Sequence, residues 1–106
     1  MSARVVIRRA AKRDLDALTD YFLNEADTET AGRFVEQART SFLALAETSG
    51  LGPPVATRAL GLSSLRKWRV DGFPKVLIFY EPIERGVRIV RILHSAADWW
   101  SLVTVN

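Results

Sequence analysis

Hydrophobic and polar positions follow two different periods along this chain of 106 residues. Residues 4–9 form a short run rich in β-branched side chains, which predicts a first strand with basic flanks. From Ala11 the apolar spacing changes to steps of four, three and four, which is typical of one face of a helix. The residues on this face are Ala11, Leu15, Leu18 and Phe22. Leu23 points away from the face, whereas Asp14 and Asp16 lie early in the helix, where negative charge is favourable.

A second helical pattern covers about residues 29–49, after a break at residues 24–27. Asp27 or Thr28 can cap this helix, because their side-chain oxygens accept hydrogen bonds from unpaired backbone N–H groups. The pattern gives a broad apolar face that would pack on a core. This face comprises Ala31, Phe34, Val35, Ala38, Phe42, Leu45 and Ala46. Glycine and proline at residues 50–54 then end the helix.

The second half of the chain predicts three consecutive strands joined by two turns. Residues 64–70 have strand composition, and residues 71–74 are turn formers. Residues 76–80 are a continuous apolar run, as expected for a strand buried on both faces. Residues 81–86 turn the chain again. Residues 87–94 form the last strand, on which each face would carry apolar side chains and one arginine.

The order strand, helix, helix, strand, strand, strand predicts an α+β domain in which a helical hairpin lies over a sheet. Hydrophobic residues make up 48% of the chain, enough for the core of one domain spanning residues 1–106. The chain has no cysteine, which excludes disulfides and suits the cytoplasm. Neither a signal peptide nor a membrane span is predicted, because no apolar run is long enough.

Positive charge is concentrated in the second half of the chain. Residues 1–62 hold eight basic and eight acidic side chains, whereas residues 63–106 hold seven basic and four acidic ones. This asymmetry suggests an acidic partner, either a nucleic acid or an acidic protein segment. The alternative is a solvated basic surface that has no partner.

His94 is the only histidine and the obvious candidate for acid–base chemistry. The alternative is a structural histidine that bonds the backbone or Asp98. We expect no metal and no cofactor, because a metal site needs three or four convergent ligands. The sequence also lacks a P-loop, a dinucleotide fingerprint and a nucleophile elbow.

The chain ends in an apolar stretch. Ser95 and Asp98 have the spacing of a capping box for a short helical turn. The apolar residues that follow are Trp99, Trp100, Leu102, Val103 and Val105. This tail either folds back on the sheet or forms an exposed contact patch.

Three motifs occur in order: Leu65-Arg66 at the start of a strand, an apolar strand ending in Phe79-Tyr80, and Val87-x-Ile89-x-x-Ile92-Leu93-His94-x-Ala96-x-Asp98. Together they resemble the ParE branch of the ParE/RelE toxin superfamily, and the first half fits the same family. The resemblance implies a β-α-α-β-β-β fold with a mostly antiparallel sheet packed against the hairpin. It also implies the toxin of a type II toxin–antitoxin system, which inhibits DNA gyrase by binding and has no catalytic residues. Its partner would be a ParD-like antitoxin whose C-terminal segment wraps the toxin.

RelE-type members of the superfamily are instead ribosome-dependent mRNA endonucleases. Breaking RNA needs a base, an acid and positive charge at the phosphate. The residues that could supply them are Arg66, Arg69, Arg91 and His94. No tyrosine follows His94, however. In this respect the chain resembles the ParE branch, whose members lack the nuclease residues.

We expect one region of the chain to bind the proposed target, DNA gyrase. Its residues are Arg66, Arg69, His94, Asp98, Trp99 and Trp100. Ala97 stands where the family often has an arginine, and the tryptophan pair could substitute for it through apolar or stacking contacts. We expect no direct nucleic-acid binding by the toxin alone.

Overall fold

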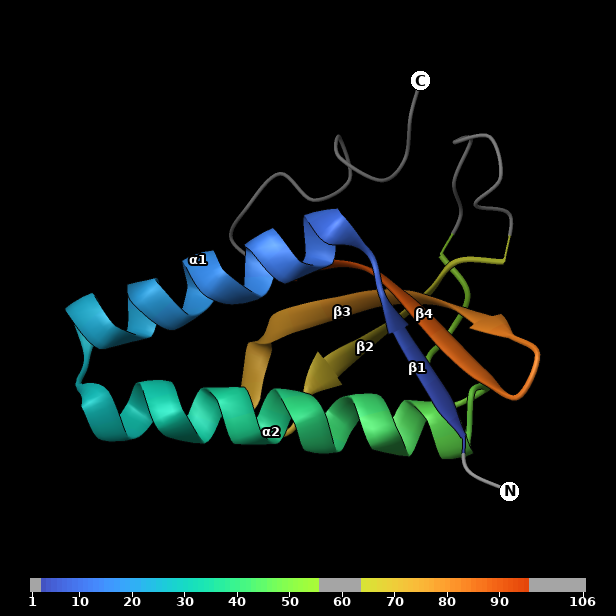
Figure 1. Ribbon diagram of the computed structural model, residues 1–106, viewed down its shortest axis with the longest axis horizontal. Coiled ribbons are helices and arrows are strands. Elements are labelled where there is room, and N and C mark those ends of the chain that lie inside the picture. Colours follow the sequence, from blue (N-terminus) through green and yellow to red (C-terminus); the bar gives the residue numbers. More distant parts are fainter. Residues whose placement is uncertain (1–2, 56–63, 96–106) are drawn as a thin grey trace.

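The computed structural model describes residues 3–55 and 64–95. The elements are β1 (Arg4–Ile7), α1 (Arg9–Glu25), α2 (Thr28–Glu47), β2 (Arg66–Val70), β3 (Phe73–Ile83) and β4 (Gly86–His94). The two helices form an antiparallel hairpin that packs on the four-stranded sheet (Figure 1). The predicted α+β class and order of elements are confirmed.

The strands of the sheet lie in the order β1-β4-β3-β2, so the first strand of the chain lies beside the last. β1 runs parallel to β4, with Arg4 opposite Gly86 and Ile7 opposite Ile89. The other two pairs are antiparallel. A parallel pair needs a crossover connection. The helical hairpin and the two strands that follow it provide this connection.

The central strand β3 spans Phe73–Ile83 and is longer than the predicted run of residues 76–80. Pro82 lies inside it, opposite Val87 of β4. Its missing N–H costs no bond to β2, because β2 pairs with β3 only as far as Tyr80. The strand therefore continues through a residue that often marks a turn.

The two turns are shorter than predicted, since much of residues 71–74 and 81–86 belongs to strands. Each turn contains one residue in the left-handed region, Gly72 with φ 79° and Arg85 with φ 63°. Glycine adopts this conformation freely, whereas arginine does so at a cost.

β4 does not alternate strictly between the two faces of the sheet. Its pairing with β3 shifts after Phe79, which leaves Val90 as an extra residue in a bulge. The core on the helix side of the sheet therefore contains Val87, Ile89 and Ile92, whereas a second cluster contains Val90 and Leu93. The predicted regular alternation along this strand is wrong at Val90.

Most of the predicted helical core is confirmed. The apolar side chains of α1, from Ala11 to Phe22, pack in the helix-side core. The predicted face of α2 is buried except for Val35, which is 43% exposed at the margin of that face. Ser41 is buried as well, and its hydroxyl accepts a hydrogen bond of 3.0 Å from the Asp71 N–H.

The predicted N-cap of α2 is confirmed, but the dipole argument for α1 is wrong. The Asp27 carboxylate accepts a hydrogen bond of 2.7 Å from the Thr30 N–H, and hydrogen bonds from Thr30 lower the pKa of Asp27. α1 begins at Arg9, and its first turn contains no acidic residue. Asp14 and Asp16 thus lie too far along the helix to act at its N-terminus.

Candidate functional site

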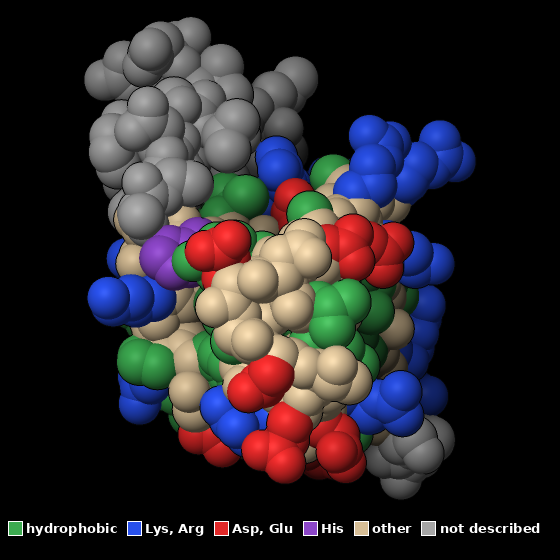
Figure 2. Space-filling model, turned by 90° about the vertical axis from the view of Figure 1, so that its left-hand side faces the viewer, with side chains coloured by type: hydrophobic (Ala, Val, Ile, Leu, Met, Phe, Trp, Pro, Cys, Tyr) green, Lys and Arg blue, Asp and Glu red, His purple; other side chains and the backbone are tan. Residues whose placement is uncertain are grey.

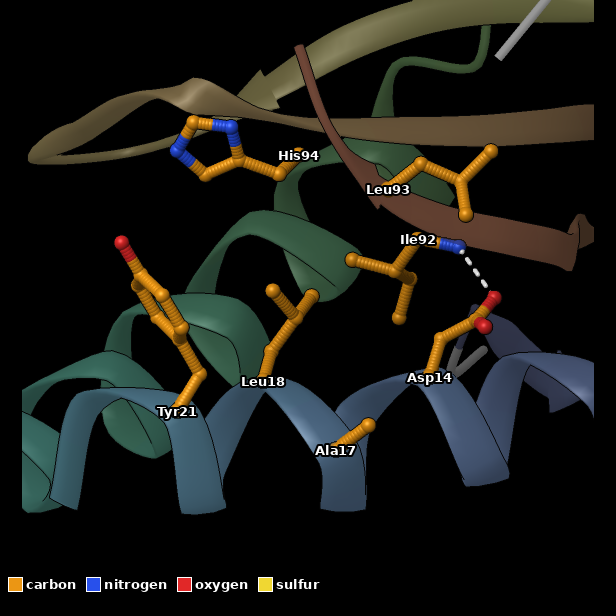
Figure 3. A pocket seen from close by; sticks show the side chains of 7 residues that line it. All are labelled: Asp14, Ala17, Leu18, Tyr21, Ile92, Leu93 and His94. Carbon is orange, nitrogen blue, oxygen red and sulfur yellow. Dashed lines mark hydrogen bonds between the residues drawn. The ribbon is translucent and has the colours of Figure 1, made fainter. Parts of the chain in front are cut away.

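A cavity of about 410 Å³ lies between α1 and the end of β4. Its lining residues are Asp14, Ala17, Leu18, Tyr21, Ile92, Leu93 and His94 (Figure 3). The cavity forms because β1 pairs with β4 only as far as Ile89. Beyond that point α1, which follows β1 directly, becomes the neighbour of β4.

Asp14 anchors β4 to α1. Its carboxylate accepts hydrogen bonds of 2.8 and 3.0 Å from Nε and Nη2 of Arg91. It also accepts a hydrogen bond of 2.9 Å from the Ile92 N–H, drawn in Figure 3. The carboxylate thus supplies the acceptor that a neighbouring strand would otherwise provide.

The ion pair is largely enclosed, since the side chains of Asp14 and Arg91 are 12% and 26% exposed. The hydrogen bond to Asp14 raises the pKa of Arg91, although burial opposes the shift. Arg91 therefore stabilises the fold, and its guanidinium is committed to α1.

His94 lies at the end of β4, on the rim of the cavity. Its ring is 6.2 Å from the ring of Tyr21 between centroids, with a tilt of 58°. Figure 3 shows both rings at the same end of the cavity, one from β4 and one from α1. In Figure 2 the histidine lies at the surface of the end of the molecule that carries the turn between the helices. The rim therefore presents an imidazole and a phenol side by side.

Sequence reasoning did not single out Asp14 as an anchor or Tyr21 as a site residue. The signal was nevertheless present, because Tyr21 follows Asp14 by seven residues and Ala17 and Leu18 lie between them. Residues at these spacings share one face of a helix. The residues of α1 that line the cavity therefore recur with the same helical spacing as those that face the core.

Arg66 is part of a structural cluster at the other end of β3. Its Nη1 donates a hydrogen bond of 2.6 Å to the Gly52 carbonyl. The Tyr80 hydroxyl accepts a hydrogen bond of 2.9 Å from the Gly52 N–H and donates one of 2.8 Å to the Ser49 carbonyl. Burial raises the pKa of Tyr80, while the bond from Gly52 and the charge of Arg66 oppose the shift. The cluster fastens the segment after α2 to the sheet.

Arg69 lies on the opposite face of the sheet from His94. Its guanidinium carbon is 5.1 Å from the centre of the Trp68 ring, and its side chain is exposed. Arg69 pairs with Leu77, a residue of the second cluster, so it faces away from the helices. The structure therefore separates the three described candidates, Arg66, Arg69 and His94.

The predicted nuclease residues do not converge on one position. Arg66 and Arg91 are held by backbone and carboxylate acceptors, and Arg69 faces away from His94. A cleavage site needs its acid, base and cation within reach of one phosphate. The four residues do not form such a site in this structure.

The remaining predicted target-binding residues, Asp98, Trp99 and Trp100, lie outside the described residues. So do the apolar tail and, except for Ser95, the predicted capping box. Within residues 3–55 and 64–95, no three or more His, Cys, Asp or Glu side chains come together as metal ligands. None of the helices in these ranges is long and apolar enough to cross a membrane.

The fold is that of a small α+β domain whose helical hairpin covers one face of a sheet closed by a parallel first strand. A family model described as the ParE toxin of the type II toxin–antitoxin system parDE matches residues 5–99. The chain therefore belongs to the ParE toxin family.

A solved structure from P. aeruginosa, titled as a chromosomal ParDE TA system, resembles this chain with a TM-score of 0.68 and 19% identity. The match covers 89% of this chain and 95% of that chain. At this identity the likeness shows the shared fold. Among curated proteins, none matches the sequence.

Proposed function

We propose that this protein inhibits DNA gyrase by binding it, without catalysis, and that a ParD-like antitoxin neutralises it. The observation that carries the proposal is the ParE family match over residues 5–99. The geometry supports binding over cleavage, because the four candidate nuclease residues are separated or committed to structural bonds.

The proposed gyrase contact surface is the rim of the cavity between α1 and β4. Tyr21 is 48% exposed there and lies against His94. Aromatic side chains with a polar end are common anchors of protein interfaces. Residues 96–100, with Asp98 and the tryptophan pair, follow this rim directly in sequence, and we include them in the proposed surface.

The antitoxin would supply acidic and apolar side chains. The basic excess of residues 63–106 suits an acidic segment that orders when it binds. A cytoplasmic location follows from the proposed target, because gyrase acts on chromosomal DNA. Residues 1–106 would act together as one toxin domain.

The decisive experiment is a supercoiling assay with purified gyrase, relaxed plasmid, ATP and the toxin. We expect supercoiling to fall as the toxin concentration rises and to recover when a ParD-like antitoxin is added. Unchanged supercoiling, together with mRNA cleavage on translating ribosomes, would instead establish the nuclease alternative.

Two variants locate the surface in the same assay. We expect Tyr21→Ala to weaken inhibition about tenfold, since a central aromatic anchor contributes more than 1 kcal/mol to an interface. Leu43→Ala is the matched control, because Leu43 is also exposed but lies on α2, outside the cavity lining. Equal inhibition by both variants would place the gyrase contact elsewhere.

Truncation after Ser95 tests the C-terminal part of the proposed surface. We expect toxicity to fall more than antitoxin binding. Equal loss of both activities, or unfolding seen by circular dichroism, would contradict this assignment.

A further inference from the structure

The two layers of the fold carry opposite charge. Helices α1 and α2 contain seven acidic and five basic side chains. The strands contain one acidic residue, Glu81, and seven basic ones. The basic residues of the strands are Arg4, Arg66, Lys67, Arg69, Lys75, Arg88 and Arg91. The molecule is therefore electrically polar from the helices to the sheet.

Five of these cations lie on the face of the sheet that points away from the helices. One is the half-buried Lys67, opposite Phe79, and the other four are Arg4, Arg69, Lys75 and Arg88. Each of these four is the immediate neighbour of strand residues whose side chains lie in the helix-side core, such as Val5, Val70, Val76 and Val87. Since neighbouring side chains of a strand point to opposite faces, these four point away from the helices. We call this surface the basic face.

Most of the charge on the basic face is available. Arg4, Arg69 and Lys75 are exposed, and within residues 3–55 and 64–95 the ion pairs of the structure involve other residues. Arg88 binds Glu81 at 2.7 Å, so one carboxylate neutralises one of the five cations. A net excess of positive charge remains.

Most of the apolar centre of the same face is not available, although Leu77 is only half-buried. Phe79, Val90 and Leu93 are at most 8% exposed. A protein partner would need accessible apolar anchors at the centre of its contact. A phosphate backbone needs only cations. In the inhibited complex, from which the antitoxin is absent, the chemistry of the basic face therefore fits a nucleic acid better than a gyrase surface.

We propose that the basic face contacts the phosphates of the DNA that gyrase holds, while the cavity rim contacts gyrase itself. This inference rests on the proposed function. Lys75 and Glu81, the partner of Arg88, are six residues apart on β3, which corresponds to about 20 Å. A DNA duplex presents about twelve phosphates over that length. The acidic helix layer is repelled by DNA and orients the basic face toward it.

Three or four phosphate contacts give only weak, salt-sensitive binding. The logarithm of the affinity would fall with the logarithm of the salt concentration with a slope of about −3. Such contacts contribute when a protein partner already holds the toxin beside DNA. The expectation that the toxin alone does not bind nucleic acid is therefore compatible with this proposal.

The test compares two charge-reversal variants. Arg69→Glu/Lys75→Glu alters the basic face, and Arg13→Glu/Arg39→Glu alters exposed cations of α1 and α2. Both variants lower the formal net charge of the protein by four, starting from +3. They therefore differ only in whether the sheet or the helices carry the substitutions. Fluorescence anisotropy of labelled toxin measures affinity for gyrase alone and for gyrase bound to a duplex.

We expect the wild-type toxin to bind gyrase–DNA about tenfold more tightly than gyrase alone at low salt, an advantage that declines as salt rises. The basic-face variant should lose this advantage and still bind gyrase alone, whereas the helix-layer variant should keep it. Wild-type binding to gyrase with no gain from DNA, or equal behaviour of the two variants, would overturn the inference and leave the proposed function intact. No binding of wild-type toxin to gyrase in either form would overturn both.

A photo-reactive amino acid at position 75 provides an independent readout. Cross-linking within the inhibited complex should attach the toxin to labelled DNA. A cross-link to a gyrase subunit in place of DNA would assign the basic face to a protein contact and overturn the inference.

Discussion

Replacement of Asp14 should destabilise the protein far more than replacement of Asp16 on the same helix. Asp14 accepts three hydrogen bonds, two from the Arg91 guanidinium and one from the Ile92 N–H. Asp16 is exposed. The substitutions Asp14→Ala and Asp16→Ala remove the same atoms and add the same helix propensity, so their difference isolates the anchor.

The magnitude follows from burial. Breaking a fully buried ion pair costs about 3–5 kcal/mol, and exposed pairs contribute less than about 1 kcal/mol. The Arg91 side chain is 26% exposed, which places the loss of the pair near 2 kcal/mol. An unpaired Ile92 N–H adds about 1 kcal/mol. Asp14→Ala should therefore cost about 2–3 kcal/mol, and Asp14→Asn about half as much, because the amide oxygen still accepts one bond.

Urea unfolding followed by circular dichroism measures this difference. With a slope of about 1–2 kcal/mol per molar urea, the midpoint should fall by more than 1 M for Asp14→Ala and by little for Asp16→Ala. A double-mutant cycle with Arg91→Met should give a coupling of about 1–2 kcal/mol. A cost below about 0.5 kcal/mol for Asp14→Ala would show that the pair behaves like a surface ion pair, and the anchoring argument would fail.

Three further substitutions test other parts of the fold by thermal and chemical unfolding. Tyr80→Phe leaves two backbone partners unpaired and should cost about 1–3 kcal/mol. Since burial raises the pKa of Tyr80, the folded state binds its proton more tightly. The stability of the wild type should therefore decline above about pH 10, and this decline should be smaller in Tyr80→Phe; identical alkaline profiles would contradict the shift. Gly86→Ala places a Cβ against the Arg4 backbone and should prevent β1 from pairing, so a folded variant with native stability would refute the close approach. Leu23→Gln should change stability by less than about 0.5 kcal/mol, because Leu23 is 47% exposed; a larger loss would mean that the side chain packs.

Patterns of local origin were predictable from the sequence. The apolar period of α1 and the oxygen of Asp27 act within a few residues, and both were identified correctly. The order of the elements also followed from local signals, because each element has its own period and its own end signals.

Features that depend on distant segments were not predictable in the same way. Pro82 looks like a turn residue, but β2 ends before it and the strand continues. The bulge at Val90 depends on how β3 and β4 align, and no residue type in β4 predicts it. The anchoring role of Asp14 depends on where β1 stops and on Arg91, which lies 77 residues from Asp14 in the sequence. Candidate site residues were therefore named individually, but which of them share a face was decided by tertiary structure.

Two unpaired stretches of strand are protected, one along β2 and one on β4 beyond the end of β1, and this has a consequence for aggregation. An exposed strand edge can recruit a strand from another molecule. On β2, the Lys67 N–H donates to the Pro53 carbonyl and the Val55 N–H donates to the Leu65 carbonyl.

On β4, beyond the end of β1, the Asp14 carboxylate takes the Ile92 N–H. A foreign strand would have to displace a proline-containing segment at β2, or a charged carboxylate at the part of β4 that β1 leaves uncovered. These two stretches of the sheet therefore offer little template for strand-to-strand self-assembly.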